Sequence, residues 1–533
     1  MSTALLCETV TGTSMAALRA ARDAARVGDM VELRLDGVAD LDVAGALDGR
    51  RGPVVVTCRP EWEGGTFRGS EDDRQRILGR AMDLGADHVD IEWKTLHGGH
   101  ADDYSALVRR DPSRVLLSSH DFDGVPADLE TRVRDMRRHE PGVIKIAVAT
   151  RRLADTLALK PIGVEGNAVV IGMGDAGVPS RLLATHYASR WTYAGNAVAP
   201  GQIPAERMVT EFGFRRVTAH TRVFGVVSSN AMHSLSPVMH NAAFEAAGLD
   251  AVYVPLQAAD MDDFLEFAAA LGVEGASVTI PFKRDALNAA ASADDLTRQV
   301  GAANTLRRPG SDVAGGRIPS GEDAGPGFTR PGENGVAGFS RSLAWEATNT
   351  DVAGFLEPLE ALFAQPLDGV RAAVLGAGGS ARAVIVALLS RGARVTVHAR
   401  RPEQAHDVTA ALGASIGTWP VPGGSWDILV NCTPLGGAAL RHESPLPGGP
   451  FTGRLVYDLT YGPGESPLIR EAREAECATL DGLPMLIAQA ERQFEWWTGR
   501  KPEDGVMRAA VYARLGRPAT PQTTGTPSHR VSL

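Results

Sequence analysis

Two lysines lie in sequence settings that suit carbonyl chemistry, one in each half of the 533-residue chain. Lys145 stands in Gly-Val-Ile-Lys-Ile-Ala-Val (142–148), and Lys283 ends Ser-Val-Thr-Ile-Pro-Phe-Lys (277–283). An amine within an apolar strand can form a Schiff base with a ketone, because burial lowers the pKa of lysine from about 10.4 and frees the nucleophile. A lysine in a polar loop can instead relay a proton. The sequence therefore predicts two carbonyl reactions on one polypeptide.

His120, in Ser-Ser-His-Asp-Phe (118–122), is a candidate acid–base residue because imidazole titrates near neutral pH. An iminium acidifies the neighbouring C–H bond, so a histidine can remove that proton and later return one to a departing hydroxyl. Arg59 and Arg181 can hold a carboxylate through bidentate hydrogen bonds. Plainer explanations exist, since a lysine on an apolar strand can snorkel from a sheet edge and a His-Asp pair is often a turn or cap.

Short apolar runs alternate with helical patterns through the first 200 or so residues, which favours a parallel sheet. The predicted strands are Ala4–Glu8, Met30–Leu35, Pro53–Cys58, His88–Glu92, Arg114–Ser118, Val143–Val148, Ala168–Ile171 and Arg190–Tyr193. The clearest predicted helices are Met15–Val27, Asp72–Leu84, Asp128–His139 and Arg151–Leu159. Eight strand–helix repeats in this length predict a compact, closed (β/α)8 barrel, so the fold class is α/β.

In such a barrel the carboxyl ends of the strands meet at one mouth, where active sites form. This rule brings together polar residues from strands two, five and six and from the segments after strands three, seven and eight: Glu32, Arg34, Arg59, Glu63, His120, Lys145, Arg181 and Gln202. Glu32 and Arg34 are two apart on one face of a strand, so a structural ion pair is the alternative for these two.

The strand–helix pattern restarts at Thr221 and again near Arg371. The predicted elements are strands Val223–Val227, Val252–Pro255, Ala276–Thr279, Ala372–Leu375 and Arg394–His398 and helices Pro237–Ala247, Met261–Leu271 and Ala381–Ser390. Residues 308–345, rich in Gly, Pro and Ser, are interpreted as a mobile insertion. We expect domains at 1–218, 219–365 and 366–482, helices at 483–517 that return to the second domain, and a disordered tail at 518–533.

A glycine-rich segment, Val-Leu-Gly-Ala-Gly-Gly-Ser-Ala-Arg-Ala (374–383), follows a predicted strand and opens a predicted helix. Gly376 permits the tight turn, Gly378 lets a pyrophosphate approach the backbone, and the helix N-terminus stabilises its charge. After the next strand, Arg400 and Arg401 suit a 2′-phosphate, so NADP is favoured over NAD. The alternatives are a glycine turn without a ligand and two solvated surface arginines.

The composition limits the class of protein. With 44% hydrophobic and 22% charged residues the chain is typical of a soluble globular protein, and its net charge of -10 and pI near 5.8 argue against a nucleic-acid-binding one. It has no run of about 18 apolar residues and no basic segment followed by an apolar run at its N-terminus, so we expect neither a membrane nor a secreted protein. The scattered cysteines indicate no metal site and suit a reducing cytoplasm: Cys7, Cys58, Cys432 and Cys477.

Most of residues 1–215 resemble the type I 3-dehydroquinate dehydratases. The matching strings are Val-Glu-Leu-Arg-Leu-Asp (31–36), Thr-Cys-Arg-Pro-Glu-Trp-Glu-Gly-Gly (57–65), Ser-His-Asp-Phe (119–122), Val-Ile-Lys-Ile-Ala (143–147), Met-Gly-Asp-Ala-Gly-Val-Pro-Ser-Arg (173–181) and Ala-Pro-Gly-Gln (199–202). The resemblance implies that Lys145 is the Schiff-base lysine and His120 the acid–base residue. It implies substrate binding and orientation by Glu32, Arg34, Arg59, Glu63, Arg181 and Gln202. Val198 stands where the family usually has a serine; we expect activity to survive because the lysine and histidine remain.

Residues 220–515 resemble shikimate dehydrogenase, which implies a two-lobed α/β unit with a Rossmann NADP-binding lobe. The matching strings are His-Ser-Leu-Ser-Pro (233–237), Val-Thr-Ile-Pro-Phe-Lys (278–283), Gly-Ala-Ala-Asn-Thr-Leu (301–306), Asn-Thr-Asp-Val-Ala-Gly (349–354), Asn-Cys-Thr-Pro-Leu-Gly (431–436), Tyr-Asp-Leu-Thr-Tyr-Gly-Pro (457–463) and Gly-Leu-Pro-Met-Leu-Ile-Ala-Gln (482–489). The resemblance implies Lys283 and Asp351 as the catalytic pair. It implies substrate contacts by Ser234, Ser236, Thr279, Asn304, Asp351 and Gln489, and cofactor contacts by Gly376, Gly378, Gly379, Ser380, Ala381, Arg400, Arg401 and Thr433. The residues alone leave simpler roles open, as helix caps for Ser234 and Ser236 and as turn residues for Asn304 and Asn349.

Together the two resemblances imply a bifunctional shikimate-pathway enzyme that dehydrates 3-dehydroquinate and then reduces the product with NADPH, an order also found in fused plant enzymes. Its partners would be these small molecules, without nucleic acid or membrane, and a homodimer is compatible with the sequence. Two other interpretations stay open: a catabolic quinate/shikimate dehydrogenase that prefers NAD, and a ligand sensor without turnover. The intact lysines, His120 and Asp351, and the lack of a basic DNA-binding segment, argue against a sensor.

Overall fold

The computed structural model describes residues 3–196, 199–310, 344–363, 365–437 and 440–518. Val198, residues 311–343 of the predicted insertion and residues 519–533 of the predicted tail lie outside the described residues. The chain divides into two compact units: the first holds Met1–Ser234 and Asp250–Val273, and the second holds Leu235–Leu249 and Glu274–Leu533. In the part of the chain that is described, no helix has the length and apolar character needed to cross a lipid bilayer.

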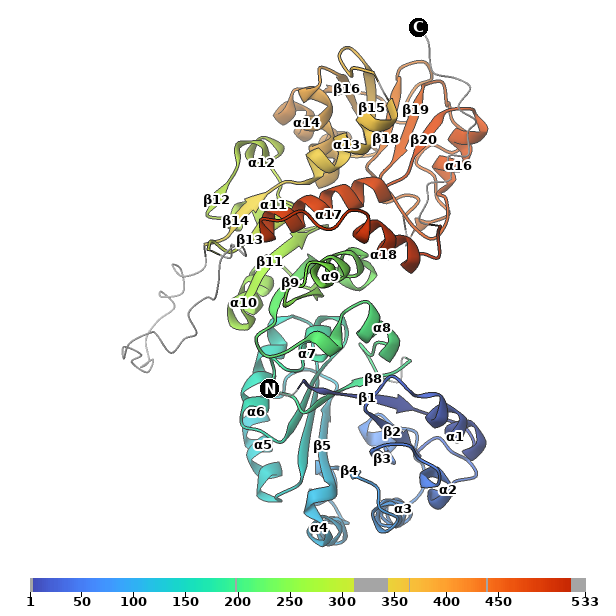
Figure 1. Ribbon diagram of the computed structural model, residues 1–533, viewed down its shortest axis with the longest axis vertical. Coiled ribbons are helices and arrows are strands. Elements are labelled where there is room, and N and C mark those ends of the chain that lie inside the picture. The colour runs from blue at the N-terminus through green and yellow to red at the C-terminus, as the bar shows by residue number, and fades with distance from the viewer. Residues whose placement is uncertain (1–2, 197–198, 311–343, 364, 438–439, 519–533) are drawn as a thin grey trace, which may run out of the picture. The chain divides into compact units, whose positions relative to one another are not determined.

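The first unit is built around an eight-stranded parallel sheet, as the strand–helix alternation predicts (Figure 1). Its strands are β1 (Leu5–Val10), β2 (Met30–Arg34), β3 (Val54–Thr57), β4 (His88–Glu92), β5 (Val115–Asp121), β6 (Val143–Ala149), β7 (Ala168–Met173) and β8 (Trp191–Ala194). The hydrogen-bonded order runs β7-β6-β5-β4-β3-β2-β1-β8. The Arg190 N–H donates to the Ala168 carbonyl at 2.9 Å, which brings β8 towards β7. The barrel, predicted to be closed, is therefore nearly closed, because β7 and β8 are not paired as strands along their length.

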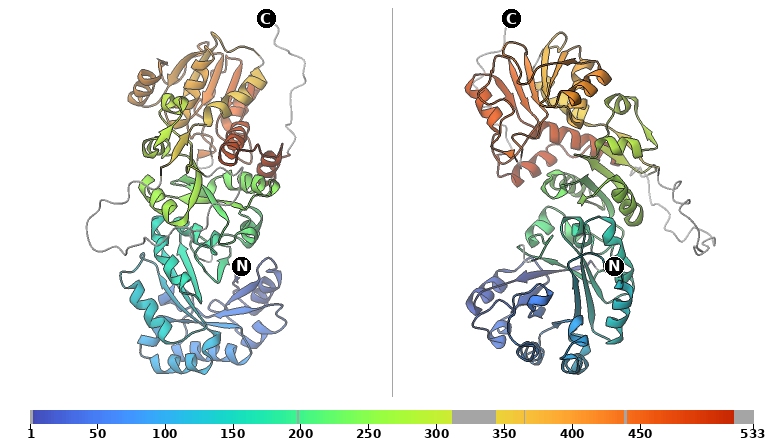
Figure 2. Two further views of the ribbon diagram at one scale, coloured as in Figure 1. Left: turned by 60° about the vertical axis from the view of Figure 1, so that its left-hand side comes forward. Right: turned by 180° about the vertical axis from the view of Figure 1, so that it is seen from behind.

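Helices lie on the outside of these strands, as the two views of Figure 2 also show. They are α1 (Met15–Ala24), α2 (Val43–Leu47), α3 (Glu71–Asp83), α4 (Ala101–Arg110), α5 (Leu129–Arg138), α6 (Leu159–Val164), α7 (Val178–Leu182) and α8 (Ala205–Thr210). The predicted helix Arg151–Leu159 is wrong, because this stretch forms a 3-10 turn, Ala154–Ala158, before α6. The reason is a tertiary contact, since the buried Asp263 carboxylate accepts the N–H groups of Leu153 and Ala154.

Apolar side chains fill the barrel below its mouth, and polar ones begin one layer higher. Cys7, Met30, Val55 and Trp191 belong to the buried apolar cluster. Two residues further along β1 and β2, Thr9 is in register with Glu32, and on β5 and β6 Ser118 is in register with Lys145. Because side chains alternate between the two faces of a strand, these polar residues point into the same interior as the apolar layer.

The remainder of the first unit is a parallel strand pair with a helix. β9 (Arg222–Ser228) pairs with β10 (Ala251–Gln257), and α10 (Met261–Leu271) follows. Asp263, which holds the turn after β6, lies in the first turn of α10. The elements expected here from the sequence are confirmed, with α10 at the predicted bounds.

The second unit contains a mixed strand group and a parallel sheet. The group consists of β11 (Val273–Val278), β12 (Ser292–Ala293), β13 (Thr305–Arg307) and β14 (Glu346–Thr348), in the order β11-β13-β14-β12. Its helices are α9 (Ser236–Ala246), α11 (Lys283–Ala289), α12 (Asp295–Val300) and α13 (Asp351–Phe363). Lys283 and Asp351 are the first residues of α11 and α13, so two helix starts carry the predicted catalytic pair.

The parallel sheet has the strand order β17-β16-β15-β18-β19-β20. Its strands are β15 (Arg371–Leu375), β16 (Arg394–His398), β17 (Ser415–Ile416), β18 (Ile428–Asn431), β19 (Leu455–Asp458) and β20 (Ala478–Leu480), and the helices in and after it are α14 (Gly379–Ser390), α15 (Pro402–Leu412), α16 (Pro467–Glu474), α17 (Leu483–Thr498) and α18 (Val506–Arg514). The chain order reverses between β15 and β18, which makes the carboxyl ends of these two strands a topological switch point, where dinucleotides bind in such sheets.

Candidate active sites

One pocket at the mouth of the barrel is lined by every residue that the sequence predicted there: Glu32, Arg34, Arg59, Glu63, His120, Lys145, Arg181 and Gln202. These residues come from six different strands or the loops after them, so the convergence depends on the barrel and not on any one segment. Ala147, Ile171, Met173 and Tyr193 add apolar surface. The pocket therefore combines a few charged groups with apolar walls, as small-molecule sites do.

Lys145 lies on β6 with only 5% of its surface exposed, so it does not snorkel from a sheet edge. Its Nζ is 3.5 Å from Asp90 Oδ2 and 3.6 Å from Glu32 Oε1. The Tyr193 ring covers it, with 4.2 Å between Nζ and the ring centroid. The amine thus has carboxylate oxygens that can take up or return protons, and an aromatic face that stabilises a cation at this position.

Glu32 and Arg34 do not form the ion pair that was the alternative for them. Glu32 instead accepts hydrogen bonds from the Thr9 hydroxyl at 2.8 Å and the Thr57 hydroxyl at 2.9 Å. Arg34 donates from Nε and NH2 to Asp36, at 2.8 and 2.9 Å. Asp36 lies just beyond β2, where it can reach Arg34 from the loop. Glu32 therefore faces Lys145 without an arginine of its own strand attached.

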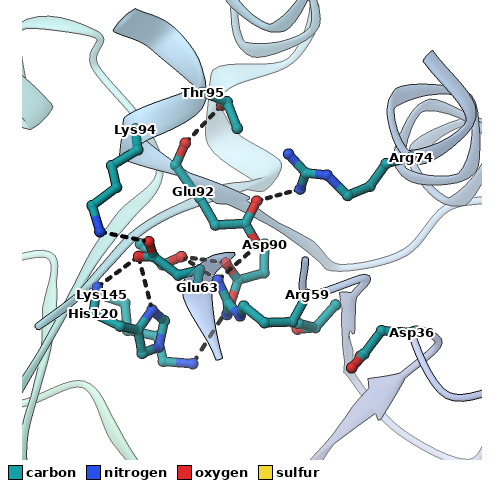
Figure 3. Close-up of polar contacts among 12 residues, drawn as sticks. Asp36, Arg59, Glu63, Arg74, Asp90, Glu92, Lys94, Thr95, His120 and Lys145 are labelled. Atoms are coloured by element: carbon teal, nitrogen blue, oxygen red, sulfur yellow. Dashed lines mark hydrogen bonds and ion pairs between the residues drawn. The ribbon is translucent and has the colours of Figure 1, made fainter. Parts of the chain in front are cut away.

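His120 and Glu63 are in contact at the end of β5 (Figure 3). Glu63 Oε1 accepts the backbone N–H of His120 at 2.8 Å and lies 3.4 Å from its Nδ1. Burial, and then the nearby cations Arg59 and Lys145, hold the pKa of His120 well below its usual range. The imidazole is therefore neutral near pH 7, which is the form a general base requires.

Arg59 is held by protein carboxylates. Its NH1 donates to Glu92 Oε1 at 2.8 Å and to the Ser118 hydroxyl at 2.9 Å, and its NH2 donates to Asp90 Oδ2 at 2.6 Å. Arg74, which is fully buried, contacts the other oxygen of Glu92 (Figure 3). Burial alone would raise the pKa of Asp90, but Arg59 and Lys145 outweigh it and hold that pKa below its ordinary value. Bidentate capture of a substrate carboxylate by Arg59, as the sequence suggested, does not fit these contacts.

Arg181 is better placed than Arg59 to bind a carboxylate. It is 1% exposed, and among the described residues its hydrogen-bond partners are two carbonyl oxygens, those of Tyr193 at 3.4 Å and Pro200 at 3.1 Å. Burial lowers its pKa to about 10. A buried guanidinium without a paired anion is costly, so an anionic ligand would stabilise it. Gln202 closes this side of the pocket and donates to the Thr9 hydroxyl at 3.3 Å.

Asp90, Glu92, Ser118, Tyr193 and Lys94 were not singled out from the sequence, although all five contact predicted site residues. A signal was present for the two acids. Val-Asp-Ile-Glu (89–92) places two charges on a predicted strand, at alternate positions that share one face. Charges on a buried strand face need partners, so this pattern could have placed both acids in the site.

The second unit brings Lys283 and Asp351 together. Lys283 Nζ donates to Asp351 Oδ2 at 2.6 Å and lies 3.4 Å from the Ser380 hydroxyl at the start of α14. Asn304 donates to the other carboxylate oxygen of Asp351 at 2.8 Å. Lys283, Asp351 and Asn304 are 7%, 4% and 2% exposed. The lysine is thus a buried cation with its carboxylate in place and a glycine loop beside it.

Hydrogen bonds from three segments fix this pair. The Asn349 side chain accepts the Asp351 N–H at 3.0 Å and donates to the Ala302 carbonyl at 2.8 Å. The Asn304 side chain accepts the Thr350 N–H at 2.8 Å and lies 3.3 Å from Gln489 Oε1. Asn304 and Asn349 therefore join buried segments and are not simple turn residues.

The remaining predicted substrate contacts lie at element ends. The helix α9 starts at Ser236 and its N-cap residue is Leu235, so neither Ser234 nor Ser236 is the N-cap that the simpler interpretation assumed. Ser234 follows the 3-10 turn Ala231–His233 in the first unit. Thr279 follows β11 in the second unit, is half-buried, and accepts the Phe282 N–H through its carbonyl at 2.9 Å.

The glycine loop follows β15 and leads into α14, as predicted. Gly376 has a φ of 102°, in the left-handed region that favours glycine, and it lies beside Thr433. A Cβ on Gly379 would lie 3.1 Å from Lys283 Cδ, so a glycine here lets the lysine pack on the helix start. Gly378 is the N-cap of α14 and supplies no side-chain cap, which leaves N–H groups of the first turn for an anion.

Residues from two neighbouring strand ends complete the dinucleotide site. The Gly376 N–H donates to the His398 carbonyl at 2.9 Å, so the loop after β16 with Arg400 and Arg401 adjoins the glycine loop. Both arginines are exposed, and neither forms an ion pair with another of the described residues. Thr433 is fixed by Asn431, whose Oδ1 accepts its N–H at 2.9 Å and its hydroxyl at 2.7 Å. This arrangement suits a pyrophosphate at the helix start and a 2′-phosphate at the arginines.

Comparisons with known families agree with this geometry. Residues 6–218 match the family model for type I 3-dehydroquinase. Residues 226–306 match the shikimate dehydrogenase substrate binding domain, and residues 482–512 match the shikimate 5'-dehydrogenase C-terminal domain.

Individual relatives show the same division. A bifunctional 3-dehydroquinate dehydratase/shikimate dehydrogenase of Arabidopsis thaliana, described as chloroplastic, is 28% identical over 88% of this chain and 78% of its own length. Shikimate dehydrogenases (NADP(+)) of Methanothermobacter thermautotrophicus and Salinibacter ruber are 34% and 35% identical over 56% of this chain and 99% and 98% of their own lengths.

Two solved structures are also similar. The dehydroquinate dehydratase and shikimate dehydrogenase of S. pombe AroM has 21% identity and a TM-score of 0.40 over 96% of this chain and 99% of its own. Shikimate 5-dehydrogenase from Thermus thermophilus, in complex with NADP(H) and shikimate, has 31% identity and a TM-score of 0.43 over 55% of this chain and 99% of its own. With nearly the whole length of shikimate dehydrogenases matched at 34–35% identity, the chain belongs to the shikimate dehydrogenase family and carries a type I 3-dehydroquinase domain before that part.

Proposed function

We propose that this chain is a bifunctional enzyme that dehydrates 3-dehydroquinate to 3-dehydroshikimate in the first unit and reduces 3-dehydroshikimate to shikimate with NADPH in the second. The observation that carries the proposal is the barrel pocket, which is lined by a buried amine, a neutral histidine and a buried guanidinium with no carboxylate partner among the described residues. A hydroxy-ketone with a carboxylate is the substrate that uses all three groups.

In the dehydratase reaction Lys145 Nζ attacks the ketone carbon, and loss of water gives an iminium. His120 removes the proton from the adjacent carbon, and the electron pair of that C–H bond expels the neighbouring hydroxyl, which leaves as water with the proton that His120 returns. Hydrolysis of the iminium returns the lysine and releases the enone. Arg181 binds the carboxylate, and Glu32, Arg34, Arg59, Glu63 and Gln202 orient the ring or the catalytic groups.

In the dehydrogenase reaction the Lys283 ammonium donates a proton to the oxygen of the reduced ketone. Asp351 orients Lys283, because its Oδ2 accepts a hydrogen bond from the lysine Nζ at 2.6 Å. Asn304 holds Asp351 and excludes other orientations of the carboxylate. Ser234, Ser236, Thr279 and Gln489 are the proposed contacts for the substrate hydroxyls and carboxylate. NADPH supplies the hydride when bound.

NADP would be held by the elements around the switch point. The first turn of α14 would receive its pyrophosphate, beside Gly376, Ser380, Ala381 and Thr433. Arg400 and Arg401 would bind the 2′-phosphate that distinguishes NADP from NAD.

A coupled assay tests the whole proposal. The full chain, given 3-dehydroquinate and NADPH, should consume both and release shikimate. Each reaction is then measured separately on the full chain. Dehydration is followed as enone formation without cofactor, and reduction is followed as NADPH oxidation with 3-dehydroshikimate. If the protein oxidises quinate with NAD in preference to shikimate with NADP, the catabolic alternative is correct. Ligand binding without any turnover would instead favour the sensor.

We further propose a cytoplasmic location, small-molecule partners without nucleic acid, and the domain limits expected from the sequence. The four cysteines support the first of these, since all are free thiols. Limited proteolysis tests the domain limits, and sedimentation of the purified chain tests whether it is the homodimer that the sequence allows.

A further inference from the structure

Lys94 lies next to the proposed dehydratase site without belonging to its predicted set. It is the second residue of a 3-10 turn, Trp93–His97, that directly follows β4. Its Nζ is 3.1 Å from Glu63 Oε2 (Figure 3). The Lys94 side chain is 46% exposed, whereas the Glu63 side chain is fully buried. A solvent-facing cation therefore reaches a carboxylate that has no solvent contact of its own.

Glu63 connects Lys94 to His120. Its Oε2 contacts Lys94, and its Oε1 accepts the backbone N–H of His120 at 2.8 Å and lies 3.4 Å from the ring Nδ1. One carboxylate thus stands between the outer cation and the imidazole. Any change in the charge or position of Glu63 acts directly on His120.

The five charged groups that face His120 come from four strands or the segments after them: Arg34 on β2, Arg59 and Glu63 after β3, Asp90 on β4 and Lys145 on β6. Asp90 is already bonded to Arg59 and to the Ser118 hydroxyl. Glu63 is the carboxylate in contact with the ring, so its negative charge stabilises an imidazolium. Lys94 offsets its negative charge from the opposite side.

We propose that Lys94 is a positioning residue for the dehydratase reaction, which by pairing with Glu63 fixes that carboxylate against His120 and keeps the imidazole in its neutral, proton-accepting form. The inference rests on the proposed dehydratase function and deepens it. The low pKa of His120, which follows from burial and then from Arg59 and Lys145, agrees with it. A purely structural role would stabilise the fold little, since a half-exposed ion pair is screened by solvent.

The experiment compares Lys94→Met, Lys94→Arg and the wild-type chain by the pH dependence of kcat/KM for dehydration. Removing the cation leaves the Glu63 charge unopposed, which raises the pKa of His120. We expect the acidic limb of Lys94→Met to move up by about half a pH unit, a fraction of the 1–3 units that a directly paired charge gives. The rate at the acidic end then falls about threefold, while the plateau rate is retained. Lys94→Arg keeps the charge and should follow the wild type.

Lys501→Met is the matched control, because Lys501 is an exposed lysine of the second unit and its loss changes the net charge equally. The NADPH-dependent activity of each variant reports whether the chain is folded. A Lys94→Met profile that superimposes on the wild type, or a shift that Lys501→Met reproduces, overturns the inference. A wild-type chain with no dehydratase activity overturns the proposed function itself, and with it this role.

Discussion

The Nζ of Lys283 and the Oδ2 of Asp351 lie 2.6 Å apart although the two residues are 68 positions apart in the chain. Their side chains are 9% and 6% exposed. Asp351 is the first residue of α13, where the helix dipole favours its negative charge, whereas Lys283 starts α11, where the dipole opposes a cation. The Asp351 carboxylate therefore offsets the unfavourable interaction between Lys283 and this helix start, and the two residues act as one unit.

Lys283→Ala should lower kcat for the reduction of 3-dehydroshikimate by about 10²–10⁴-fold, the usual contribution of a general acid. The affinity for NADPH should change little, because the proposed cofactor contacts lie on other residues. Steady-state kinetics and cofactor titration measure the two effects, and dehydratase activity in the same sample serves as the folding control. An unchanged kcat would contradict the proton-donor role.

Borohydride reduction in the presence of 3-dehydroquinate should attach the ligand covalently to Lys145, because an iminium is reduced to a stable secondary amine. Peptide mass mapping should find the adduct on the segment that contains Lys145. Lys145→Met should lose both the adduct and the dehydratase activity while reduction of 3-dehydroshikimate continues. An adduct on Lys283 would show that the assignment of the two lysines is wrong.

Dehydration should stay efficient below pH 6.5, where an ordinary histidine becomes protonated. The pKa of His120 lies well below its model-compound value of 6.5, chiefly through burial. The neutral base is therefore present from neutral pH down through 6.5, and activity is lost only as the pH falls through the lowered value. A profile of kcat/KM against pH measures this limb. His120→Gln should remove most of the rate. An acidic limb centred at or above pH 6.5 would argue against a lowered pKa of His120.

Arg181→Met should raise KM for 3-dehydroquinate by roughly thirtyfold or more, since truncating one partner of a buried charge pair costs about 2–5 kcal/mol. The same change should leave the thermal midpoint of the ligand-free protein unchanged or higher, because it removes a buried cation that has no carboxylate partner among the described residues. Steady-state kinetics measure the change in KM, and calorimetry measures the thermal midpoint. A destabilised protein with normal KM would assign Arg181 to the fold instead.

Replacing Arg400 and Arg401 together by alanine should raise KM for NADPH about tenfold or more, because hydrogen bonds to charged groups contribute about 1.5–3 kcal/mol. KM for NADH should stay the same, since NADH lacks the 2′-phosphate. Arg394→Ala is the control, as Arg394 is exposed at the opposite end of β16. An equal rise in KM for NADPH and NADH would show that the two arginines do not bind the 2′-phosphate.

The predicted fold followed from local patterns. Strands such as His88–Glu92 and Arg394–His398 occur at the predicted bounds, because a run of β-branched and apolar residues between turn signals is a local property. The failed helix Arg151–Leu159 shows the limit of that reasoning. Its backbone is held by Asp263, a residue more than a hundred positions away, which no local window includes.

By itself the sequence determined which residues stand at the carboxyl ends of strands and at helix starts, and so which side chains enter each site: Lys145 and His120 in the barrel, Lys283 and the glycine loop in the second unit. Only the tertiary structure decided how they pair. Glu32 bonds to Thr9 and Thr57, and Arg34 bonds to Asp36 instead. Arg59 is paired with Asp90 and Glu92, and Arg181 has no carboxylate partner within the part of the chain that the structure describes. The reason is that position along a strand is encoded locally, whereas a contact between strands depends on register and barrel curvature, which the whole chain sets.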